Sequence, residues 1–333
     1  MTLAYIGSKK SLLPFLETHI KPMLGPTTVF ADLFAGTGVV GQHFKAFARK
    51  VVANDAEMYS FIVNSAMLDS DYSSKLQEII ETSNKLPGIS GLVTKHFAKD
   101  RMFFTESNAM KIDAIRTRIE DLLKDSEIDA REYYYLLACL LVAADRVANT
   151  ASVYGAYLKQ YKKSAEKTLE MKPVHTNTDN TKQNNLICRG DTLDVITDHA
   201  FDVAYIDPPY NHRQYSANYS VLNSIVHYDP ALELKGKAGV LEGYFKSSFC
   251  TRADVVRSFE TLIREVDAPC VFVSYNNEGI LSQQDMTTIF EKYGHVTLHT
   301  KAYKKFVSQK DKEVKTVYEF LYEIVKFPSH KVK

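Results

Sequence analysis

The sequence has few cysteines, no long apolar run and almost no net charge. Its 333 residues include no tryptophan and four cysteines, and 41 basic residues nearly balance 40 acidic ones. The cysteines lie too far apart to suggest a zinc site or a disulfide framework, so we expect reduced, buried thiols. No apolar run approaches the roughly 18 residues that a membrane span requires, and the N-terminus lacks the basic and apolar regions of a secretory signal. These absences predict a cytoplasmic protein without a membrane partner.

The net charge of +1 provides no overall attraction to nucleic acid. This argues against a protein that coats nucleic acid, but it allows an enzyme with a local basic cleft. The histidines show no metal-ligand spacing, so no metal site is expected.

A strand, a turn, a helix and a second strand are predicted near the N-terminus. The apolar run 29–34 leads into the glycine turn 35–38, a helical stretch covers 39–48, and a second apolar run at 51–53 ends at Asn54-Asp55. This order is a βαβ unit. Further strands are expected at 201–206 and 270–274, and 296–303 is expected to pair with 316–327.

Residues 56–185 have a different pattern. Apolar residues recur there at helical spacing, 133–147 is predicted to be a buried helix, and the asparagine-rich segment 176–185 is expected to be a loop. The sequence therefore predicts one α/β domain formed by residues 1–55 and 186–333, interrupted by a mostly helical insertion at 56–185.

The glycine turn indicates a nucleotide site. Residues 36–41 fit the pattern G-x-G-x-x-G, with Gly36 and Gly38 as its first two glycines. Asp55 follows Gly38 by 17 residues, close to the usual spacing of about 20 for a ribose-binding carboxylate. On this evidence NAD, S-adenosylmethionine and a tight turn without a ligand all remain open.

Asp32 favours S-adenosylmethionine among these alternatives. A fixed carboxylate at the end of the first strand would repel a pyrophosphate, whereas it would suit the ammonium and sulfonium of S-adenosylmethionine. The segment from Asp32 through Phe34 to Gly38 resembles the methyltransferase form of the turn, D-x-F-x-G-x-G.

Asp207-Pro208-Pro209-Tyr210 follows a predicted buried strand and has the residues of a catalytic loop. The prolines stiffen the backbone and remove two amide donors, so the carbonyl of Pro208 can be held beside the Asp207 carboxylate. Two such acceptors would bind the two hydrogens of an exocyclic amine and localise its lone pair for methyl transfer. Tyr210 offers a ring on which a flipped base can stack. A plain turn at the end of a strand is the alternative.

Taken together, these motifs resemble the Dam-like group of adenine-N6 DNA methyltransferases. Tyr5-Ile6-Gly7-Ser8-Lys9 is similar to the group's N-terminal motif, and the glycine turn and the D-P-P-Y loop follow in the group's order. The segment 207–219 resembles most closely the adenine methyltransferases of restriction–modification systems. The resemblance implies a Rossmann-like S-adenosylmethionine-dependent methyltransferase sheet with a mostly helical inserted region that recognises DNA. It also implies that the cofactor pocket includes Tyr5, Lys9, Asp32, Phe34, Asp55 and Asp191.

Double-stranded DNA is the expected partner, and a cognate restriction endonuclease would act separately. Contacts to DNA are expected just after the catalytic tyrosine and at a basic hairpin late in the chain, from Asn211, Arg213, Gln214, Lys304 and Lys305. Pairing of Arg213 with a nearby carboxylate and a solvated hairpin turn remain alternatives. Lys159, Lys162, Lys163 and Lys167 would share one face if their segment were helical.

Three other functions share some of these features. Methyltransferases of RNA or of protein amino groups use the same loop chemistry, a NAD-dependent oxidoreductase would share the glycine turn, and an inactive DNA-binding protein would keep the fold without the reaction.

Overall fold

The computed structural model describes residues 3, 7–151, 153–304 and 316–328. Seven strands form one twisted sheet in the order β3-β2-β1-β4-β7-β9-β8. β1 (Val29–Asp32), β2 (Lys50–Asp55), β3 (Leu186–Arg189), β4 (Val203–Ile206) and β7 (Cys270–Asn276) pair in parallel, whereas β9 (Thr316–Lys326) pairs antiparallel with both β7 and β8 (Gly294–Lys304). This arrangement confirms the predicted α/β sheet and its late antiparallel pair.

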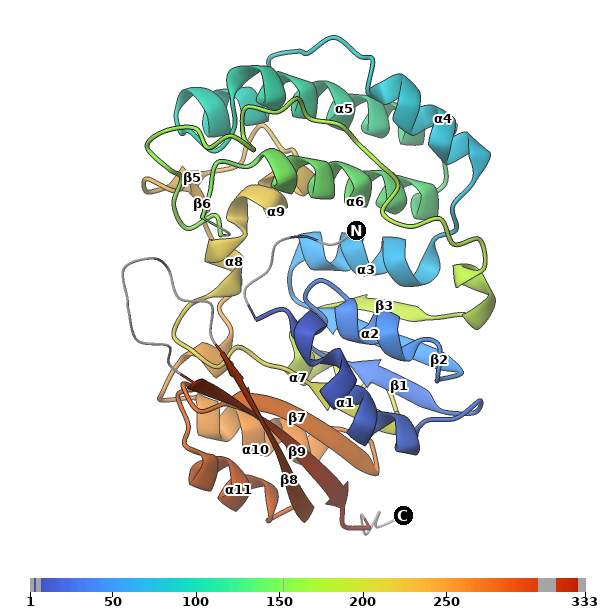
Figure 1. Ribbon diagram of the computed structural model, residues 1–333, viewed down its shortest axis with the longest axis vertical. Helices are drawn as coiled ribbons and strands as arrows, with labels where there is room; N and C mark the ends of the chain where they lie inside the picture. The colour runs from blue at the N-terminus through green and yellow to red at the C-terminus, as the bar shows by residue number, and fades with distance from the viewer. Residues whose placement is uncertain (1–2, 4–6, 152, 305–315, 329–333) are drawn as a thin grey trace.

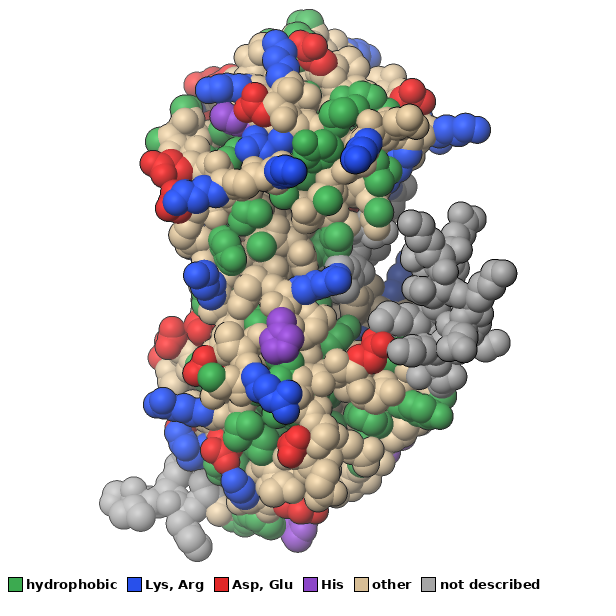
Figure 2. Space-filling view, turned by 90° about the vertical axis from the view of Figure 1, so that its left-hand side faces the viewer, with side chains coloured by type: hydrophobic (Ala, Val, Ile, Leu, Met, Phe, Trp, Pro, Cys, Tyr) green, Lys and Arg blue, Asp and Glu red, His purple; other side chains and the backbone are tan. Residues whose placement is uncertain are grey.

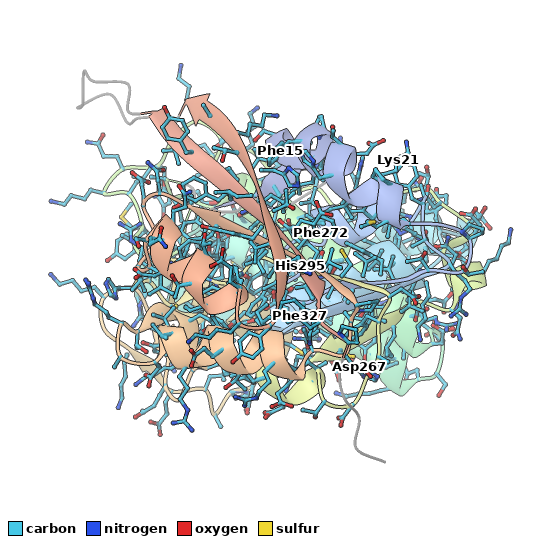
Figure 3. The ribbon with its side chains drawn as sticks, turned by 90° about the horizontal axis from the view of Figure 1, so that it is seen from below. Phe15, Lys21, Asp267, Phe272, His295 and Phe327 are labelled. Carbon is cyan, nitrogen blue, oxygen red and sulfur yellow. The ribbon has the colours of Figure 1, made fainter. Side chains whose placement is uncertain are left out.

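Helices cover both faces of the sheet. α1 (Leu13–Ile20) and α2 (Val39–Phe44) pack on one face, while α7 (Thr192–Val195), α10 (Val255–Glu265) and α11 (Gln283–Phe290) pack on the other. Viewed along the sheet, Phe15 and Asp267 lie on opposite sides of Phe272 of β7 (Figure 3). The central strands β4 and β7 are buried along their whole length, as expected for strands covered on both faces.

A mostly helical region stands at one end of the sheet (Figure 1). It contains α4 (Ser74–Ser83), the π-helical turn Thr94–Lys99, α5 (Glu106–Lys124) and α6 (Ala130–Val147). A reciprocal capping box between Asp129 and Glu132 begins α6. α3 (Met58–Asp69) joins this region to the sheet, because its residues contribute to the cores of both.

The helical region also receives residues from beyond the predicted insertion. α8 (Tyr215–Asn218), α9 (Ser220–His227) and the small hairpin of β5 (Leu234–Lys235) and β6 (Val240–Leu241) follow the catalytic loop, and α9 packs into the helical core through Leu222 and Ile225. The loop predicted to be catalytic, residues 207–210, therefore lies directly between the sheet and the helical region. Two further 3₁₀ turns flank α1 at Lys9–Leu12 and Lys21–Met23, and others occur at Asn180–Gln183 and Ser248–Cys250.

The structure shortens one expected helix, and the helical condition stated for one lysine-bearing segment is not met. The stretch predicted as helical at 39–48 ends at Phe44 and continues as a turn. The lysine-bearing segment 159–167 is not helical, since the side chain of Asn149 accepts the amide hydrogen of Lys162 and holds the segment in an irregular path. No helix in the described ranges combines the length and apolar character of a membrane span.

Figure 2 shows two lobes separated by a narrower waist. Basic and acidic side chains are intermingled over both lobes, and no continuous basic stripe crosses the described part of this face. This distribution agrees with the nearly balanced charge of the chain.

Candidate active site

The candidate active site is a pocket at the point in the sheet where the order of successive strands reverses. The chain winds from β1 outward through β2 to β3, and then returns to β4 on the other side of β1. Crevices at the carboxyl ends of strands on either side of such a point are the usual ligand sites of open α/β sheets. β1 ends at Asp32 and β4 ends immediately before Asp207, so the glycine turn and the catalytic loop meet at this edge.

The glycine turn adopts a conformation that requires glycine. Gly36 and Gly38 have φ values of +52° and +72°, in the left-handed region that L side chains rarely occupy. A Cβ on Gly38 would lie 2.4 Å from Oδ1 of Asn64 in α3. The side-chain amide of Asn64 donates to the carbonyl oxygen of Gly36 at 3.2 Å. The turn is therefore shaped by its own backbone and by α3 behind it.

Asp55 lines the pocket beside the turn. Its Oδ2 accepts the amide hydrogen of Gly36 at 2.8 Å, and its Oδ1 accepts that of Glu57 at 2.9 Å. Burial raises the pKa of Asp55 despite these hydrogen bonds. The glycine turn and Asp55, which follows Gly38 by 17 residues, are therefore joined by a hydrogen bond.

Asp32 lies below the turn and not among the residues that line the pocket. Its side chain is buried, and Oδ2 accepts the amide hydrogen of Gly41 at 2.9 Å. Burial raises its pKa to about 7. Asp32 therefore does not reach the pocket, and the expected direct contact between its carboxylate and the cationic end of a cofactor is absent from this geometry.

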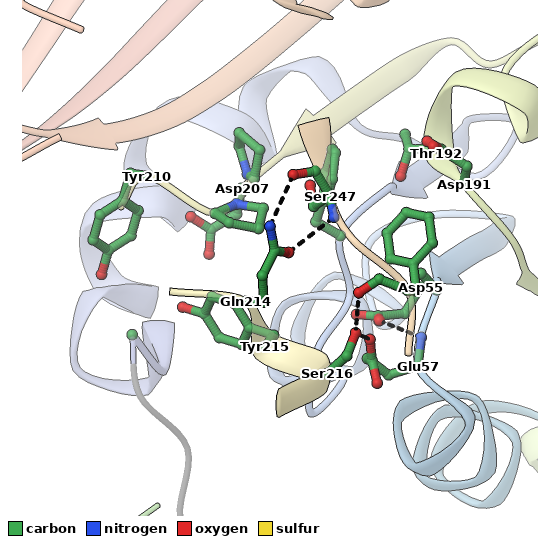
Figure 4. Close-up of a pocket in the computed structure, with 16 residues that line it drawn as sticks. Asp55, Glu57, Asp191, Thr192, Asp207, Tyr210, Gln214, Tyr215, Ser216 and Ser247 are labelled. Atoms are coloured by element: carbon green, nitrogen blue, oxygen red, sulfur yellow. Dashed lines mark hydrogen bonds between the residues drawn. The ribbon is translucent and has the colours of Figure 1, made fainter. Parts of the chain in front are cut away.

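The catalytic loop presents Asp207, Pro208, Pro209 and Tyr210 to the pocket (Figure 4). The Nζ atom of Lys9 lies 2.8 Å from Oδ1 of Asp207. Burial raises the pKa of Asp207, and the ammonium of Lys9 opposes that rise. Lys9 is predicted from its motif as a cofactor residue, but the structure places it behind the carboxylate of Asp207 and outside the lining of the pocket.

Tyr210 is fixed from two sides. Its carbonyl oxygen accepts the amide hydrogen of Ile280 at 3.0 Å, and its ring makes an edge contact with Tyr275, with centroids 6.1 Å apart. Gly7, with a φ of +75°, brings the N-terminal segment close enough that a Cβ there would lie 3.1 Å from the hydroxyl of Tyr210. The N-terminal motif and the catalytic loop therefore pack against each other.

Other pocket residues were not singled out from the sequence. Glu57 follows Asp55, and its carboxylate accepts hydrogen bonds from the hydroxyl of Ser216 and from the side-chain amide of Asn223. Burial raises the pKa of Glu57 to about 7. Phe245 and Ser247 reach the pocket from a loop after β6, and no local pattern marks them. The remaining unpredicted lining residues are Gly7, Ala56, Thr192 and Tyr215.

Among the residues predicted to contact DNA, Gln214 forms hydrogen bonds within the protein through its side chain. Its side-chain amide accepts from the amide of Ser247 at 2.9 Å and donates to the carbonyl of Ser247 at 3.3 Å (Figure 4). The side chain of Asn211 accepts the amide hydrogen of Arg213 at 2.9 Å, and the side chain of Arg213 is exposed. No carboxylate of the described residues forms an ion pair with Arg213.

The remaining predicted residues divide by position. Phe34 and Asp191 line the pocket, and Asp191 also caps α7 by accepting the amide hydrogen of Leu193 at 3.0 Å. Lys304 ends β8. Tyr5 and Lys305 lie outside the described residues.

The charge of the pocket distinguishes between the two cofactors that the glycine turn allows. Asp55, Glu57, Asp191 and Asp207 all contribute to its lining, and none of the described residues that line it is a lysine or an arginine. A pyrophosphate would meet like charge on every side, whereas a sulfonium and an ammonium would be attracted. The residues present therefore fit S-adenosylmethionine.

The fold and the site define a class of enzyme, in which a doubly wound sheet holds a cationic cofactor next to a loop of hydrogen-bond acceptors. Residues 5–289 match the family model of the D12 class N6 adenine-specific DNA methyltransferases. Type II methyltransferase M.NlaIII of Neisseria lactamica is 41% identical over 334 residues, covering 97% of this chain and 99% of that protein. Type II methyltransferase M.CviAII of Paramecium bursaria Chlorella virus 1 is 38% identical over 327 residues, covering 96% and 97%. Modification methylase StsI of Streptococcus sanguinis is 32% identical, and the chain spans 52% of its length.

The chain belongs to the D12 class N6 adenine-specific DNA methyltransferases. It transfers a methyl group from S-adenosylmethionine to the N6 atom of adenine in DNA. Membership of this family resolves the alternatives that the sequence left open, since the substrate is DNA and the cofactor is not NAD.

Proposed function

We propose that this enzyme is the modification methyltransferase of a restriction–modification system and acts in the cytoplasm on duplex DNA. Two relatives that align over almost the whole length of both proteins are named type II methyltransferases. In this role it would methylate one short sequence wherever that sequence occurs, and a separate endonuclease would cut the same sequence when it is unmethylated.

The chemistry centres on the acceptor pair of the catalytic loop. We propose that Asp207 and the carbonyl of Pro208 each accept one hydrogen of the adenine amino group. The nitrogen lone pair, otherwise delocalised into the ring, is then directed toward the methyl group. S-adenosylmethionine supplies that methyl group on a sulfonium. With the cofactor bound, its methyl group would pass to this nitrogen and leave a neutral thioether. Asp207 and the Pro208 carbonyl would hold the amino group during the transfer, and the proton that the nitrogen loses would pass to solvent.

The target adenine must leave the helix to reach this loop. Asp207 lines a pocket at the sheet edge and its side chain is 16% exposed, so a base still stacked in a duplex would not reach it. We propose that the flipped base stacks on Tyr210. The rest of the cofactor pocket would be formed by Phe34, Asp55 and Asp191, and the exposed side chain of Arg213 would contact the DNA backbone.

The observation that carries the assignment of the catalytic loop is the position of Asp207, which stands at the switch point of the sheet and lines the acidic pocket. Asp207→Ala is expected to lower the rate of methyl incorporation into duplex DNA by at least about 100-fold, with cofactor affinity nearly unchanged. Labelled cofactor and equilibrium binding measure the two effects. Asp254→Ala, an exposed carboxylate that caps a turn with Thr251, is the control. Unchanged turnover in the Asp207 variant would overturn the assignment.

The biological role has a separate test. Single-molecule sequencing of host DNA, with and without this protein, is expected to show N6-methyladenine at every copy of one short motif. DNA modified in this way should also resist an endonuclease of that specificity. Methylation scattered over unrelated sequences would argue against a role in restriction–modification.

A further inference from the structure

Two buried charged residues stand behind the catalytic carboxylate. The Nζ atom of Lys9 lies 2.8 Å from Oδ1 of Asp207 and 3.3 Å from Oε1 of Glu319. The side chain of Lys9 is 5% exposed and that of Glu319 is 2% exposed. Glu319 belongs to β9, where it lies opposite Asn276 of β7 and Lys301 of β8. The family's reaction needs Asp207 as an acceptor, but it does not by itself explain a second buried carboxylate on the same lysine.

The charge balance of this cluster is unusual. Lys9 and Asp207 alone would form a neutral pair, whereas an ionised Glu319 would bring the cluster to a net charge of −1. Burial raises the pKa of Glu319, and the ammonium of Lys9 opposes that rise. Burial acts to lower the pKa of Lys9, but the two carboxylates outweigh it and raise that pKa well above its usual range. The ammonium is therefore firmly charged and is shared between two acceptors.

Part of the Asp207 side chain is exposed, although one of its carboxylate oxygens is buried. Its Oδ1 is buried and lies next to Lys9, so the 16% exposure of the side chain comes from its other atoms. Asp207 lines the pocket, but Lys9 and Glu319 do not. Lys9 reaches the pocket lining through Asp207 and through the ring of Tyr210, whose centroid lies 5.7 Å from its Nζ atom, whereas Glu319 reaches it through Lys9.

The other titratable groups near this cluster come from several elements. Tyr205 precedes Asp207 on β4, Tyr210 and Tyr215 face it from the catalytic loop and α8, and Asp32 interacts with it from β1. Lys301 is the cross-strand neighbour of Glu319. Lys9 is the cation that the described structure places in direct contact with both carboxylates.

We propose that Glu319 is a positioning residue that acts through Lys9 and preserves the effective negative charge of Asp207. Lys9 holds Asp207 in place, and Glu319 offsets the positive charge that would otherwise weaken Asp207 as an acceptor. During transfer the adenine nitrogen becomes positive, so a cluster with net charge −1 stabilises that stage more than a neutral pair. This inference rests on the proposed role of Asp207.

Glu319→Gln tests the proposal because glutamine keeps the size of the side chain and an oxygen for Lys9. The single-turnover rate, measured with saturating DNA and cofactor, is expected to fall about tenfold or more at neutral pH. Loss of a neighbouring negative charge also lowers the pKa of Asp207. The acid limb of the pH–rate profile is therefore expected to move to lower pH, which a general loss of structure would not produce.

Two further variants make the test specific. Glu319→Asp keeps the charge and is expected to recover most of the rate and the original acid limb. Glu323→Gln, on the same strand but paired with His299 at 2.8 Å, is expected to change neither. An unchanged rate in Glu319→Gln, or a lower rate with an unmoved acid limb, would overturn the proposal.

The same assay separates this inference from the proposed role of Asp207. If Asp207→Ala is inactive and Glu319→Gln behaves as the wild type, the inference about Glu319 alone is wrong. If Asp207→Ala remains active, the role of the catalytic loop is wrong, and the proposal for Glu319 is overturned with it.

Discussion

The carboxylate of Glu57 accepts hydrogen bonds from Ser216 and Asn223, which lie 159 and 166 residues later in the chain. These contacts join the end of β2 to α8 and α9, which follow the catalytic loop. Asp55, two residues earlier, is bonded to the glycine turn. One short segment therefore connects the glycine turn to the helices that follow the Asp-Pro-Pro-Tyr loop.

Asp55 should affect cofactor binding more than chemistry. Asp55→Ala removes the acceptor for the amides of Gly36 and Glu57, and it removes the carboxylate that would bind ribose hydroxyls. Hydrogen bonds to a charged group contribute about 1.5–3 kcal/mol each, so we expect the cofactor Kd to rise roughly 10- to 100-fold. Titration calorimetry gives the affinity, and the rate at saturating cofactor should fall much less. A large fall in that rate with unchanged Kd would contradict the assignment.

At the scale of residues, local motifs predicted the positions of Asp55 and Asp207, because Asp55 ends a predicted strand and Asp207 follows another, and both strands end at the same edge of the sheet. Asp191 was expected from the family resemblance alone, since the short strand β3 that precedes it was not predicted. Lys9 was found by its motif, but its contact with Asp207 was not, since no spacing shows which buried groups will meet. Phe245 and Ser247 lack any local pattern and reach the pocket only through the tertiary fold.

At the scale of elements, the glycine turn depends on α3 as much as on its own sequence. Gly38 combines a positive φ with a close approach to Asn64, whereas Gly236 has a similar φ of +70° and no atom within 4 Å of the point that a Cβ would occupy. The two glycines therefore separate backbone strain from crowding.

Gly38→Ala is expected to destabilise the fold more than Gly236→Ala. The left-handed conformation alone costs about 1–2 kcal/mol for alanine, and that cost should apply to both variants. Crowding against Asn64 should add about 1–3 kcal/mol at Gly38. Urea unfolding of the two variants measures the difference, and cofactor affinity should fall only for Gly38→Ala. Equal free energies of unfolding for the two variants would show that Asn64 moves aside without destabilising the fold.

The βαβ unit could be predicted because hydrophobic runs, a glycine turn and an acid occur in the required order. The irregular conformation of the segment 159–167 could not be predicted, because lysine spacing without an apolar face does not specify whether a segment is helical. Asn149 fixes that segment instead, with its side chain bonded to Lys162 and to the carbonyls of Met102 and Leu158. Another segment of the same loop reaches α8, where the amide of Tyr154 donates to the carbonyl of Asn218.

At the scale of the whole molecule, stability should depend on the buried acid beneath the turn. The pKa of Asp32 is raised to about 7 by burial. Asp32 is neutral in both the folded and unfolded states below about pH 4. Between about pH 4 and pH 7 Asp32 loses its proton in the unfolded state but keeps it in the folded state, so a rising pH stabilises the unfolded state relative to the folded one. The favourable contribution of Asp32 is therefore present at low pH and is lost between about pH 4 and pH 7.

Asp32→Asn should reduce this pH dependence. The amide oxygen can still accept from Gly41, so the variant is expected to gain stability over the wild type as the pH rises to 7. Denaturant unfolding of the cofactor-free protein at a series of pH values measures the effect. Asp202→Asn is a matched control, because Asp202 is exposed and also accepts a backbone amide hydrogen, from Val29 at 2.7 Å. Parallel stability curves for Asp32→Asn and the wild type would contradict the argument.

DNA binding, unlike the fold, involves the electrostatics of the whole surface. The net charge is +1 and the charges on the face in Figure 2 are mixed, so attraction to phosphates must come from local groups such as Arg213. Each cation that neutralises a phosphate contributes about 0.9 to the slope of log affinity against log salt for duplex DNA. We expect a steep slope for DNA and a shallow slope for the cofactor, whose pocket is already lined by fixed carboxylates.

Arg213→Gln should lower the DNA slope by about 1, because it removes one phosphate contact. The slope for cofactor binding should not change. Lys292→Gln is the control, since Lys292 is paired with Glu260 at 2.5 Å and should release no counterion from DNA. Fluorescence anisotropy over a range of salt concentrations measures each slope. An unchanged slope for Arg213→Gln with weakened binding would instead indicate that this residue contacts a base, because base contacts contribute to affinity without releasing counterions.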